Sequence, residues 1–207
     1  MVNTRPSRYP SRGSEEKEVL YQIIDEGLFC TIAFVRDGIA QQIPTGYCRI
    51  DDDIFIHASS KSHFMDAISD NEVSYSITLM DGLVLSPTAF DSSFNYRSVI
   101  GFCKAEEVTE PSEKHEVFKV FTDRYIPGRI ADIGEPTPDQ TKITRIVKLS
   151  LENAAAKVRT GDVNMKMDED ESWCGVIPVH TSYGDPEKDS QLSDSLEVPA
   201  YIKDLVQ

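Results

Sequence analysis

Short apolar runs separated by tight turn signals constrain the fold of this chain more than any other feature. The first such runs are residues 28–35, 40–50 and 54–58. Asp37-Gly38 separates the first two runs, and an Asp-Gly pair in this position is typical of a β-hairpin. Later runs predict strands at residues 74–80, 83–85 (after an Asp81-Gly82 turn) and 96–108, and a final strand at 144–151. Many short strands with few helices between them predict a mainly β protein with peripheral helices, folded as an antiparallel barrel.

Helical patterns occur between or outside these runs. Helices are predicted at residues 14–27, 62–69 and 111–125, with a short docking helix near 201–206. Pro111 suits the first turn of a helix, where its missing N–H is not needed. Pro44 indicates an edge strand or a bulge. An acidic loop is expected at 161–171, and the polar sequence after His180 predicts a domain at 1–180, with an N-terminal arm, followed by an acidic tail at 181–207.

The charge of the chain restricts its partners. It contains 35 Asp and Glu against 21 Lys and Arg, and its formal net charge is −14. Repulsion argues against nucleic acid and anionic membranes as partners, and no apolar run is long enough to cross a bilayer. The four cysteines lack C-x-x-C spacing, which predicts reduced thiols, and the four histidines lack metal-site spacing. We therefore expect no metal site and a cytoplasmic protein, able to reach the nucleus by diffusion.

A strand, a hydroxyl-rich turn and a helix follow one another at residues 54–69. The turn consists of Ser59, Ser60, Lys61 and Ser62. Serine hydroxyls, a lysine and the free N–H groups of a helix start all favour a bound phosphate. The turn has no glycine, so it is neither a P-loop nor a dinucleotide fingerprint. A polar helix cap with a solvated lysine is the alternative, and spacing alone does not choose between the two.

Two other segments place cations within predicted strands. Arg97 and Ser98 interrupt an apolar run, and a guanidinium offers bidentate donors to a phosphate or to ring carbonyls. An outward-facing arginine is the alternative. Lys157 and Arg159 are two residues apart, so they share one face of an extended segment. They could contact a ligand or the acidic loop, but ordinary surface charge is the favoured interpretation.

Two aromatic side chains are further candidates. His57 ends the third strand beside the hydroxyl-rich turn, from where its ring could face a cofactor; a structural histidine is the alternative. Trp173 is the only tryptophan, and it could stack on a flat ligand or fill a core or subunit contact. No serine or cysteine nucleophile pairs recognisably with a histidine, so hydrolytic catalysis has no support and the catalytic acid or base is unknown.

Taken in order, eight segments resemble the pyridoxamine phosphate oxidase-like family of FMN-binding split barrels, in the branch with nitroimidazole-resistance and flavin-nucleotide-binding proteins. The segments are residues 8–14 (RYPSRGS), 25–28 (DEGL), 43–45 (IPT), 57–62 (HASSKS), 81–85 (DGLVL), 95–99 (NYRSV), 156–161 (AKVRTG) and 173–178 (WCGVIP). The resemblance extends from about residue 8 to residue 180. It implies a split barrel of about six strands and a homodimer, with FMN in clefts between the subunits.

The resemblance also implies roles for individual residues. Lys61 and Ser62 match the family's phosphate-binding block, and Arg97 and Ser98 match a strand that contacts the flavin. Trp173 resembles a C-terminal tryptophan that reaches a flavin across the dimer. The complete set of predicted cofactor-binding residues is Ile43, Pro44, Thr45, His57, Ser59, Ser60, Lys61, Ser62, Arg97, Ser98 and Trp173.

The resemblance has a limit at the C-terminal end. Genuine pyridoxamine phosphate oxidases resemble one another in an Arg-x-His segment that grips the substrate phosphate, whereas this chain has no arginine after Trp173. We therefore expect an FMN-dependent oxidoreductase acting on a small molecule that the sequence does not identify. The alternatives are a flavin-binding or interaction protein without turnover, and an unusual pyridoxamine or pyridoxine phosphate oxidase.

Overall fold

Two antiparallel sheets make up most of the structure, a computed structural model that describes residues 4, 6, 8–163, 172–193 and 195–206. The larger sheet runs in the order β1 (Gly13–Ser14), β10 (Ala154–Arg159), β7 (Ser93–Lys104), β6 (Glu72–Leu85), β2 (Phe29–Arg36) and β3 (Ile39–Gly46), and β11 (Gly175–Pro178) also pairs with β6. The smaller sheet runs in the order β4 (Cys48–Ile50), β5 (Asp53–Ser59), β9 (Thr144–Ser150) and β8 (Glu106–Glu107). The mainly β class predicted from the sequence is confirmed.

The expected closed barrel is not formed. Among the described strands, β1 and β3 end the larger sheet and β4 and β8 end the smaller one, so neither sheet closes on itself. The predicted strand 40–50 is divided at Tyr47, where the chain passes from one sheet to the other. The backbone N–H of Tyr47 donates to the Tyr125 hydroxyl at 2.8 Å, and that hydroxyl donates to the Tyr47 carbonyl at 2.9 Å. A side chain thus replaces a neighbouring strand at this corner.

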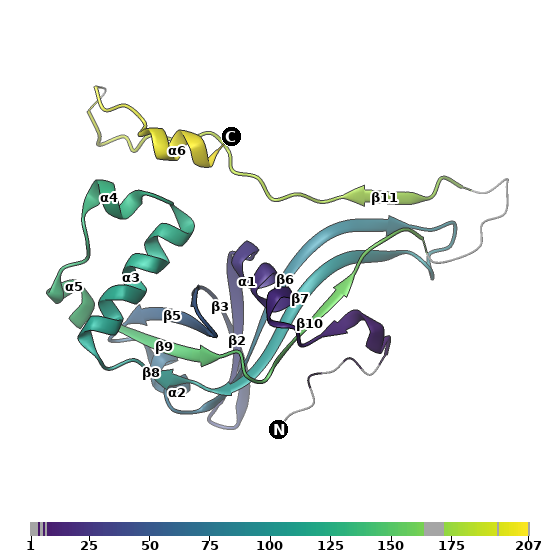
Figure 1. The fold of residues 1–207 in the computed structure, drawn as a ribbon, viewed down its shortest axis with the longest axis horizontal. Helices are drawn as coiled ribbons and strands as arrows, with labels where there is room; N and C mark the ends of the chain where they lie inside the picture. Colours follow the sequence, from purple (N-terminus) through teal and green to yellow (C-terminus); the bar gives the residue numbers. More distant parts are fainter. Residues whose placement is uncertain (1–3, 5, 7, 164–171, 194, 207) are drawn as a thin grey trace.

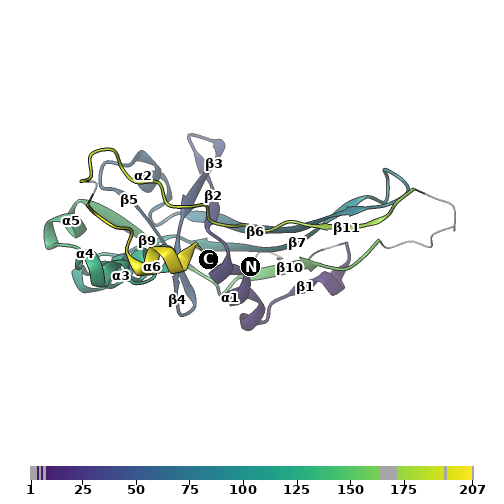
Figure 2. The same cartoon turned by 90° about the horizontal axis from the view of Figure 1, so that it is seen from above.

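The helices lie around the two sheets. They are η1 (Pro10–Arg12, a 3₁₀ turn), α1 (Lys17–Glu26), α2 (His63–Ile68), α3 (Pro111–Tyr125), α4 (Arg129–Ile133), α5 (Pro138–Lys142) and α6 (Ala200–Leu205). Figures 1 and 2 show α3, α4 and α5 together at one end of the molecule, while β6 and β7 extend toward the other end with β11 alongside β6. The molecule is therefore elongated along this β extension.

The main hydrophobic core lies where α1 and α2 meet both sheets. Leu20, Ile23 and Ile24 recur at helical spacing on α1, and all three are buried. Met65 and Ile68 anchor α2 in the same core and are fully buried. A second cluster packs α3 against the smaller sheet through Val117, Cys48, Phe55 and Ile146. The core therefore holds α2, and the turn that precedes it, in a fixed position.

Several predicted boundaries are confirmed and others are wrong. The helix at 111–125 has the predicted bounds, and Pro44 lies on the edge strand β3. The first helix begins at Lys17 rather than at Ser14, because Ser14 pairs with Ala156 in β1. The strand at 144–151 is not the last, since β10 and β11 follow it.

The prediction of a turn at Asp81-Gly82 is also wrong. Residues 72–85 form the single strand β6, and the register with β7 shifts between Met80 and Gly82, as in a β-bulge. Gly82 pairs with Asn95 of β7 on one side and with Pro178 of β11 on the other. A Cβ at Gly82 would lie 3.1 Å from the Ile177 carbonyl oxygen, so glycine permits the close approach of β11. The two strands beside Gly82 override its local turn preference.

The C-terminal segment ends in the short docking helix predicted from the sequence. The Arg129 guanidinium donates to the Tyr201 hydroxyl, which in turn donates to Asp132, and both distances are 2.7 Å. These bonds join α6 to α4. Most of the predicted acidic loop, residues 164–171, lies outside the described residues. None of the described helices has the length and apolar character needed to cross a membrane.

Candidate functional site

The hydroxyl-rich turn lies between β5 and α2, as predicted. Its backbone is fixed by three hydrogen bonds: the Ser60 N–H donates to the Ile143 carbonyl at 2.9 Å, the Ser62 N–H to the Ser59 carbonyl at 2.9 Å, and the Lys61 N–H to the Ser59 hydroxyl at 3.3 Å. These N–H groups are therefore already used within the protein. A bound phosphate would have to be held chiefly by side chains.

The side chains of this turn form a suitable donor set. Lys61 is exposed, and its ammonium forms no hydrogen bond or ion pair within the described part of the chain. The Ser60 and Ser62 hydroxyls lie on either side of it in the sequence, on backbone that β5 and the buried face of α2 hold in place. One cation with two hydroxyls fits a phosphate group. The predicted phosphate role of the turn remains a prediction that this geometry allows.

Arg97, in contrast, is bound by two carboxylates. Its Nε and Nη2 donate to the two oxygens of Asp81 at 3.0 and 2.7 Å, and Nη2 also donates to Glu26 at 2.7 Å. The bond from Nη1 to the second Glu26 oxygen completes the pairing. The hydrogen bond from Arg97 lowers the pKa of Glu26, and the two carboxylates raise the pKa of Arg97. A flavin contact from Arg97 would have to replace one of these bonds.

Sequence reasoning did not identify Glu26 and Asp81 as the partners of Arg97. Glu26 is the last residue of α1, and Asp81 lies in the bulge of β6 opposite β7. The Asp81-Gly82 signal predicts a turn, so the sequence does not place Asp81 opposite a strand. The signal that could have found it is the position of Arg97 itself: a partly buried arginine within an apolar strand requires a counter-charge.

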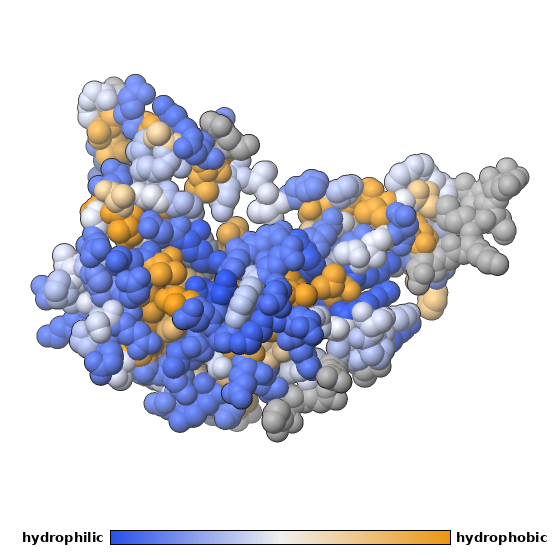
Figure 3. Space-filling view, in the orientation of Figure 1, coloured by the Kyte–Doolittle hydropathy of each residue, from blue (hydrophilic) through white to orange (hydrophobic). Residues whose placement is uncertain are grey.

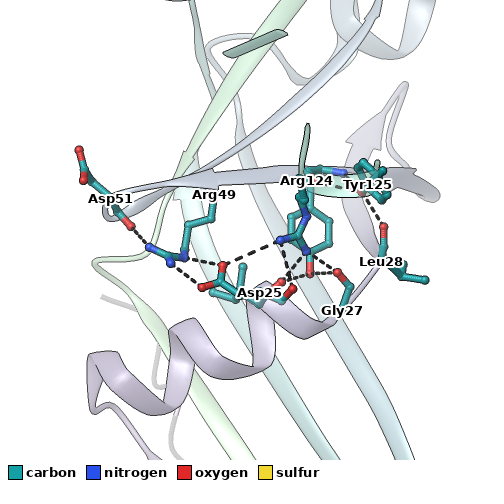
Figure 4. A network of polar contacts seen from close by, with 9 residues as sticks. Asp25, Gly27, Leu28, Arg49, Asp51, Arg124 and Tyr125 are labelled. Atoms are coloured by element: carbon teal, nitrogen blue, oxygen red, sulfur yellow. Dashed lines mark hydrogen bonds and ion pairs between the residues drawn. The ribbon is translucent and has the colours of Figure 1, made fainter. Parts of the chain in front are cut away.

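The end of α1 is held by a network that the sequence also did not reveal (Figure 4). The Arg124 guanidinium donates to the carbonyls of Ile24, at 2.7 Å, and of Gly27. The Tyr47 hydroxyl donates to the same two carbonyls at 2.6 and 3.0 Å. Arg49 forms an ion pair with Asp25. A cation at a helix C-terminus interacts favourably with the helix dipole, so this network fixes the helix end that carries Glu26.

The remaining predicted residues lie in several parts of the chain. Ile43, Pro44 and Thr45 belong to β3, which pairs only with β2 among the described strands. The Ser98 hydroxyl donates to the Lys157 carbonyl at 3.5 Å and is nearly buried. The β3 residues leave one strand edge unpaired, which is compatible with a ligand lying along it.

His57 and Trp173 have contrasting environments. The His57 ring packs edge-on against Phe121, with ring centroids 4.3 Å apart, and burial lowers its pKa. This contact supports the structural interpretation of His57. Trp173 precedes β11 and is 69% exposed. β11 pairs with the end of β6 at Leu85 and lies far from α2 in both views, so one chain does not bring Trp173 and Lys61 together (Figures 1 and 2).

The fold defines the class of this protein, which is a mainly β protein of two antiparallel sheets. The larger sheet has open edges, and a hydroxyl-rich turn precedes the short helix α2. The family model described as pyridoxamine 5'-phosphate oxidase matches residues 16–158, well over half of the chain. The protein belongs to this family. The resemblance drawn from the sequence is confirmed.

Two solved structures are similar over almost the whole chain. The flavocytochrome Anf3 from Azotobacter vinelandii has a TM-score of 0.89 and 27% identity, covering 98% of this chain and 95% of that one. The FAD and heme binding protein from Mycobacterium smegmatis has a TM-score of 0.88 and 30% identity, covering 94% and 97%.

The fold is shared with a nitroimidazole antibiotic resistance protein from Bacteroides thetaiotaomicron. That structure has a TM-score of 0.60 and 16% identity, covering 70% of this chain and 86% of that chain. No curated protein matches the chain.

Proposed function

We propose that this protein binds a flavin and a heme and transfers electrons between them and a small-molecule substrate. The observation that carries this proposal is the similarity over nearly the full length to two structures named for a flavin or cytochrome function, at 27% and 30% identity. One of them is named for both FAD and heme. Bound flavin and heme supply the redox chemistry, and the protein supplies their position and electrostatic surroundings.

The flavin phosphate is assigned to the turn at Lys61. The Lys61 ammonium, which is unpaired among the described residues, and the hydroxyls of Ser60 and Ser62 provide a set of donors on a rigid support. The chain carries a net charge of −14, so a phosphate needs such a local cation. The sequence resemblance implies FMN, whereas the structure from Mycobacterium smegmatis, at 30% identity, is named for FAD, and we therefore propose FAD as the flavin.

The heme ligand is assigned to His63. Histidine is a common heme ligand, and to serve as one it must offer an accessible imidazole nitrogen to the iron. The His63 side chain is 81% exposed at the start of α2, whose Met65 and Ile68 are fully buried. His57 is packed against Phe121, and the Nε2 of His115 is 2.9 Å from a Glu135 oxygen.

His180 is exposed too, but it lies outside every helix and strand. Among the four histidines, His63 therefore combines exposure with a fixed position.

We also propose that the protein forms a homodimer. Apolar side chains are exposed on the β extension, among them Met80 at 44%, Phe94 at 54% and Ile177 at 45%. Figure 3 shows apolar surface where β11 lies along β6. Covering such a surface with a second copy buries these side chains. The measurement is the mass in solution by light scattering, and a monomer at micromolar concentration would exclude the dimer.

The absence of arginine after Trp173 argues against oxidation of pyridoxamine phosphate. The chain lacks the cation with which genuine oxidases of this family are expected to grip the substrate phosphate. Turnover of pyridoxamine phosphate by the flavin-loaded protein would overturn this part of the proposal. A flavin-loaded protein that no donor or acceptor reduces or oxidises would instead favour a binding protein without turnover.

The cofactor assignments are tested by visible absorption after separate additions of FAD, FMN and hemin, followed by desalting. We expect the wild-type protein to retain a flavin band. Lys61→Gln should lower the flavin affinity about tenfold or more, as expected for the loss of a charge-assisted hydrogen bond. Lys203→Gln is the matched control, because Lys203 lies on α6. We expect a Soret band that His63→Ala abolishes and that His180→Ala leaves unchanged.

Each result has an opposite that refutes one assignment. A protein that retains no flavin refutes flavin binding, and equal flavin affinity in Lys61→Gln and Lys203→Gln refutes the phosphate assignment. A Soret band that survives His63→Ala refutes His63 as the ligand without affecting the flavin.

A further inference from the structure

A carboxylate lies beside His63 on the same face of α2. Asp66 follows His63 by three residues, and side chains at this spacing are neighbours on a helix surface. The His63 Nδ1 lies 3.6 Å from Oδ2 of Asp66, and the His63 side chain is 81% exposed. Because nothing encloses the ring, a small rotation shortens this contact to a hydrogen bond. Among the described residues, Nε2 of the same ring has no partner.

The other oxygen of Asp66 is held by Arg145. Arg145 lies on β9 opposite Ala58 of β5, the strand that leads into the turn before α2. Its side chain is 19% exposed, and its Nη1 donates to Oδ1 of Asp66 at 2.6 Å. This bond fixes the carboxylate of Asp66 and leaves Oδ2 as the oxygen that faces His63.

Arg145 is itself fixed by two further partners. Its Nε and Nη2 donate to the two oxygens of Glu107 on β8, at 2.8 and 2.5 Å, in a bidentate pair. Its Nη2 also donates to the Ser69 hydroxyl, just after α2, at 2.9 Å. The hydrogen bond from Arg145 lowers the pKa of Glu107, so this carboxylate stays charged. Two carboxylates therefore share one guanidinium, and the cluster keeps a net negative charge beside His63.

A carboxylate at Nδ1 changes what Nε2 can do. A proton held on Nδ1 by Asp66 leaves the lone pair of the neutral imidazole on Nε2, which is the nitrogen that a metal can bind. The negative charge also makes the imidazole a stronger donor to the iron. Oxidised heme iron carries one more positive charge than reduced iron, so a nearby anion stabilises the oxidised state more. Hydrogen bonding to the ligand is one of the means by which a protein sets a heme potential.

We propose that Asp66, anchored by Arg145, is a positioning residue that orients the His63 ring and lowers the reduction potential of the heme. This inference rests on the proposed function, in which His63 is the heme ligand. His63 has a fixed carboxylate at Nδ1 and an open Nε2, whereas the exposed His180 has no hydrogen bond or ion pair among the described residues. The Asp66 contact therefore adds a defined ring orientation to the exposure of His63.

The first test is a redox titration of the hemin-loaded full-length protein, followed by visible absorption. Asp66→Asn keeps the size of the side chain and removes its charge. We expect it to shift the preference of the site toward reduced iron about tenfold, a rise in potential of ~59 mV for a one-electron couple. Asp66→Glu restores the carboxylate and should return the potential most of the way to the wild-type value. Asp204→Asn removes the same charge on α6 and is the control, which should not change the potential.

The second test does not depend on heme. Nitrogen-15 chemical shifts of the histidine rings show which ring nitrogen carries the proton in the heme-free protein, at about pH 8.5, well above the ordinary histidine pKa of about 6.5. We expect the proton to lie on Nδ1 more often in His63 than in His180. Asp66→Ala should remove this difference, because it removes the acceptor and leaves the ring exposed.

The outcomes separate this inference from the proposed function. A wild-type protein that binds no hemin, or whose Soret band survives His63→Ala, overturns the His63 heme site and this inference together. A Soret band that depends on His63, with the same potential in Asp66→Asn and wild type, overturns this inference alone. The same proton position in His63 of Asp66→Ala and wild type would also overturn it, because Asp66 would then not orient the ring.

Discussion

Arg124 joins the end of α3 to the end of α1, and its replacement tests whether this contact stabilises the fold. The side chain is 12% exposed and donates to the Ile24 and Gly27 carbonyls, and to the Asp25 carbonyl at 3.3 Å. Its guanidinium carbon lies 4.6 Å from the centroid of the Tyr47 ring. We expect Arg124→Met, which keeps most of the aliphatic bulk, to destabilise the protein by removing these polar contacts.

The magnitude follows from what each contact loses. The Ile24 and Gly27 carbonyls also accept from the Tyr47 hydroxyl, so they keep one partner in the variant. We therefore count about one full charge-assisted hydrogen bond, ~1.5–3 kcal/mol, rather than three. The helix-dipole and cation–π interactions add about 1 kcal/mol. Arg124 Nε is buried without a partner, and losing it returns about 1 kcal/mol. The expected net loss is about 1.5–3 kcal/mol.

The assay is urea unfolding of the cofactor-free protein, with thermal unfolding in parallel. A loss of about 1.5–3 kcal/mol corresponds to a fall in Tm of about 3–12 °C for a chain of this size. Arg36→Met is the control, because Arg36 is an exposed residue whose only ion pair among the described residues, with Asp37, is 3.7 Å long. We expect it to stay within about 0.5 kcal/mol of wild type. A loss below about 1 kcal/mol in Arg124→Met would refute the idea that the Arg124 contacts stabilise the fold.

Two further predictions concern buried positions. Burial lowers the pKa of His57, so the unfolded protein binds a proton at this residue at a higher pH than the folded protein does. The free energy of unfolding should therefore fall as the pH drops through about 6.5. His57→Phe should flatten this pH dependence, which is measured from urea unfolding midpoints between about pH 8 and 5. A Cβ at Gly101 would lie 2.1 Å from the Tyr75 ring, so Gly101→Ala should cost about 1–3 kcal/mol in urea unfolding, whereas Gly184→Ala, with open space around it, should cost almost nothing. Equal slopes for His57→Phe and wild type, or equal stability of the two alanine variants, would contradict these interpretations.

The parts of the fold that the sequence predicts correctly are those determined by local signals. The helix from Pro111 to Tyr125 has a proline at its first position and an apolar face at helical spacing, and both features act within the helix. The strand, turn and helix around Lys61 are predicted correctly for the same reason. The family resemblance rests on short segments too, and it is confirmed.

The parts that the sequence predicts wrongly depend on distant strands. Asp81-Gly82 is a strong turn signal, yet β6 continues through it because β7 and β11 pair on either side of it. Tyr47 interrupts a predicted strand because the Tyr125 hydroxyl, 78 residues away, satisfies its backbone groups. Neither partner can be read from the residues next to the error.

The candidate site shows the same limit at the level of charge. The sequence identifies Arg97 as a candidate cation, but it cannot show that Glu26 and Asp81 already pair with its guanidinium. It favours surface charge for Arg159, which is nearly buried. Residue type indicates what a side chain can bind, whereas burial and the positions of counter-charges decide whether it is available. Of the two cations in the predicted cofactor-binding set, Arg97 is paired, whereas the Lys61 ammonium forms no hydrogen bond or ion pair among the described residues.

The separation of Lys61 and Trp173 within one chain bears on how a flavin site containing both would be built. Lys61 lies just before α2, and Trp173 lies just before β11, which Figure 1 shows far from α2. If both contact one flavin, as the family resemblance implies, the two side chains must come from different subunits of the proposed dimer. A heterodimer of Lys61→Gln and Trp173→Leu chains then contains one site with both lesions and one site with neither.

We therefore expect this heterodimer, isolated with two affinity tags, to retain one flavin for every two chains, although each variant homodimer retains little. The matched control is a heterodimer of the wild-type chain with the Lys61→Gln/Trp173→Leu double variant. Its two sites carry one lesion each when the site is shared between subunits, so it should retain little flavin. The opposite pattern, with flavin retained only by the control, would place both residues in a site built within one chain, and would contradict the separation of the two side chains seen in the structure.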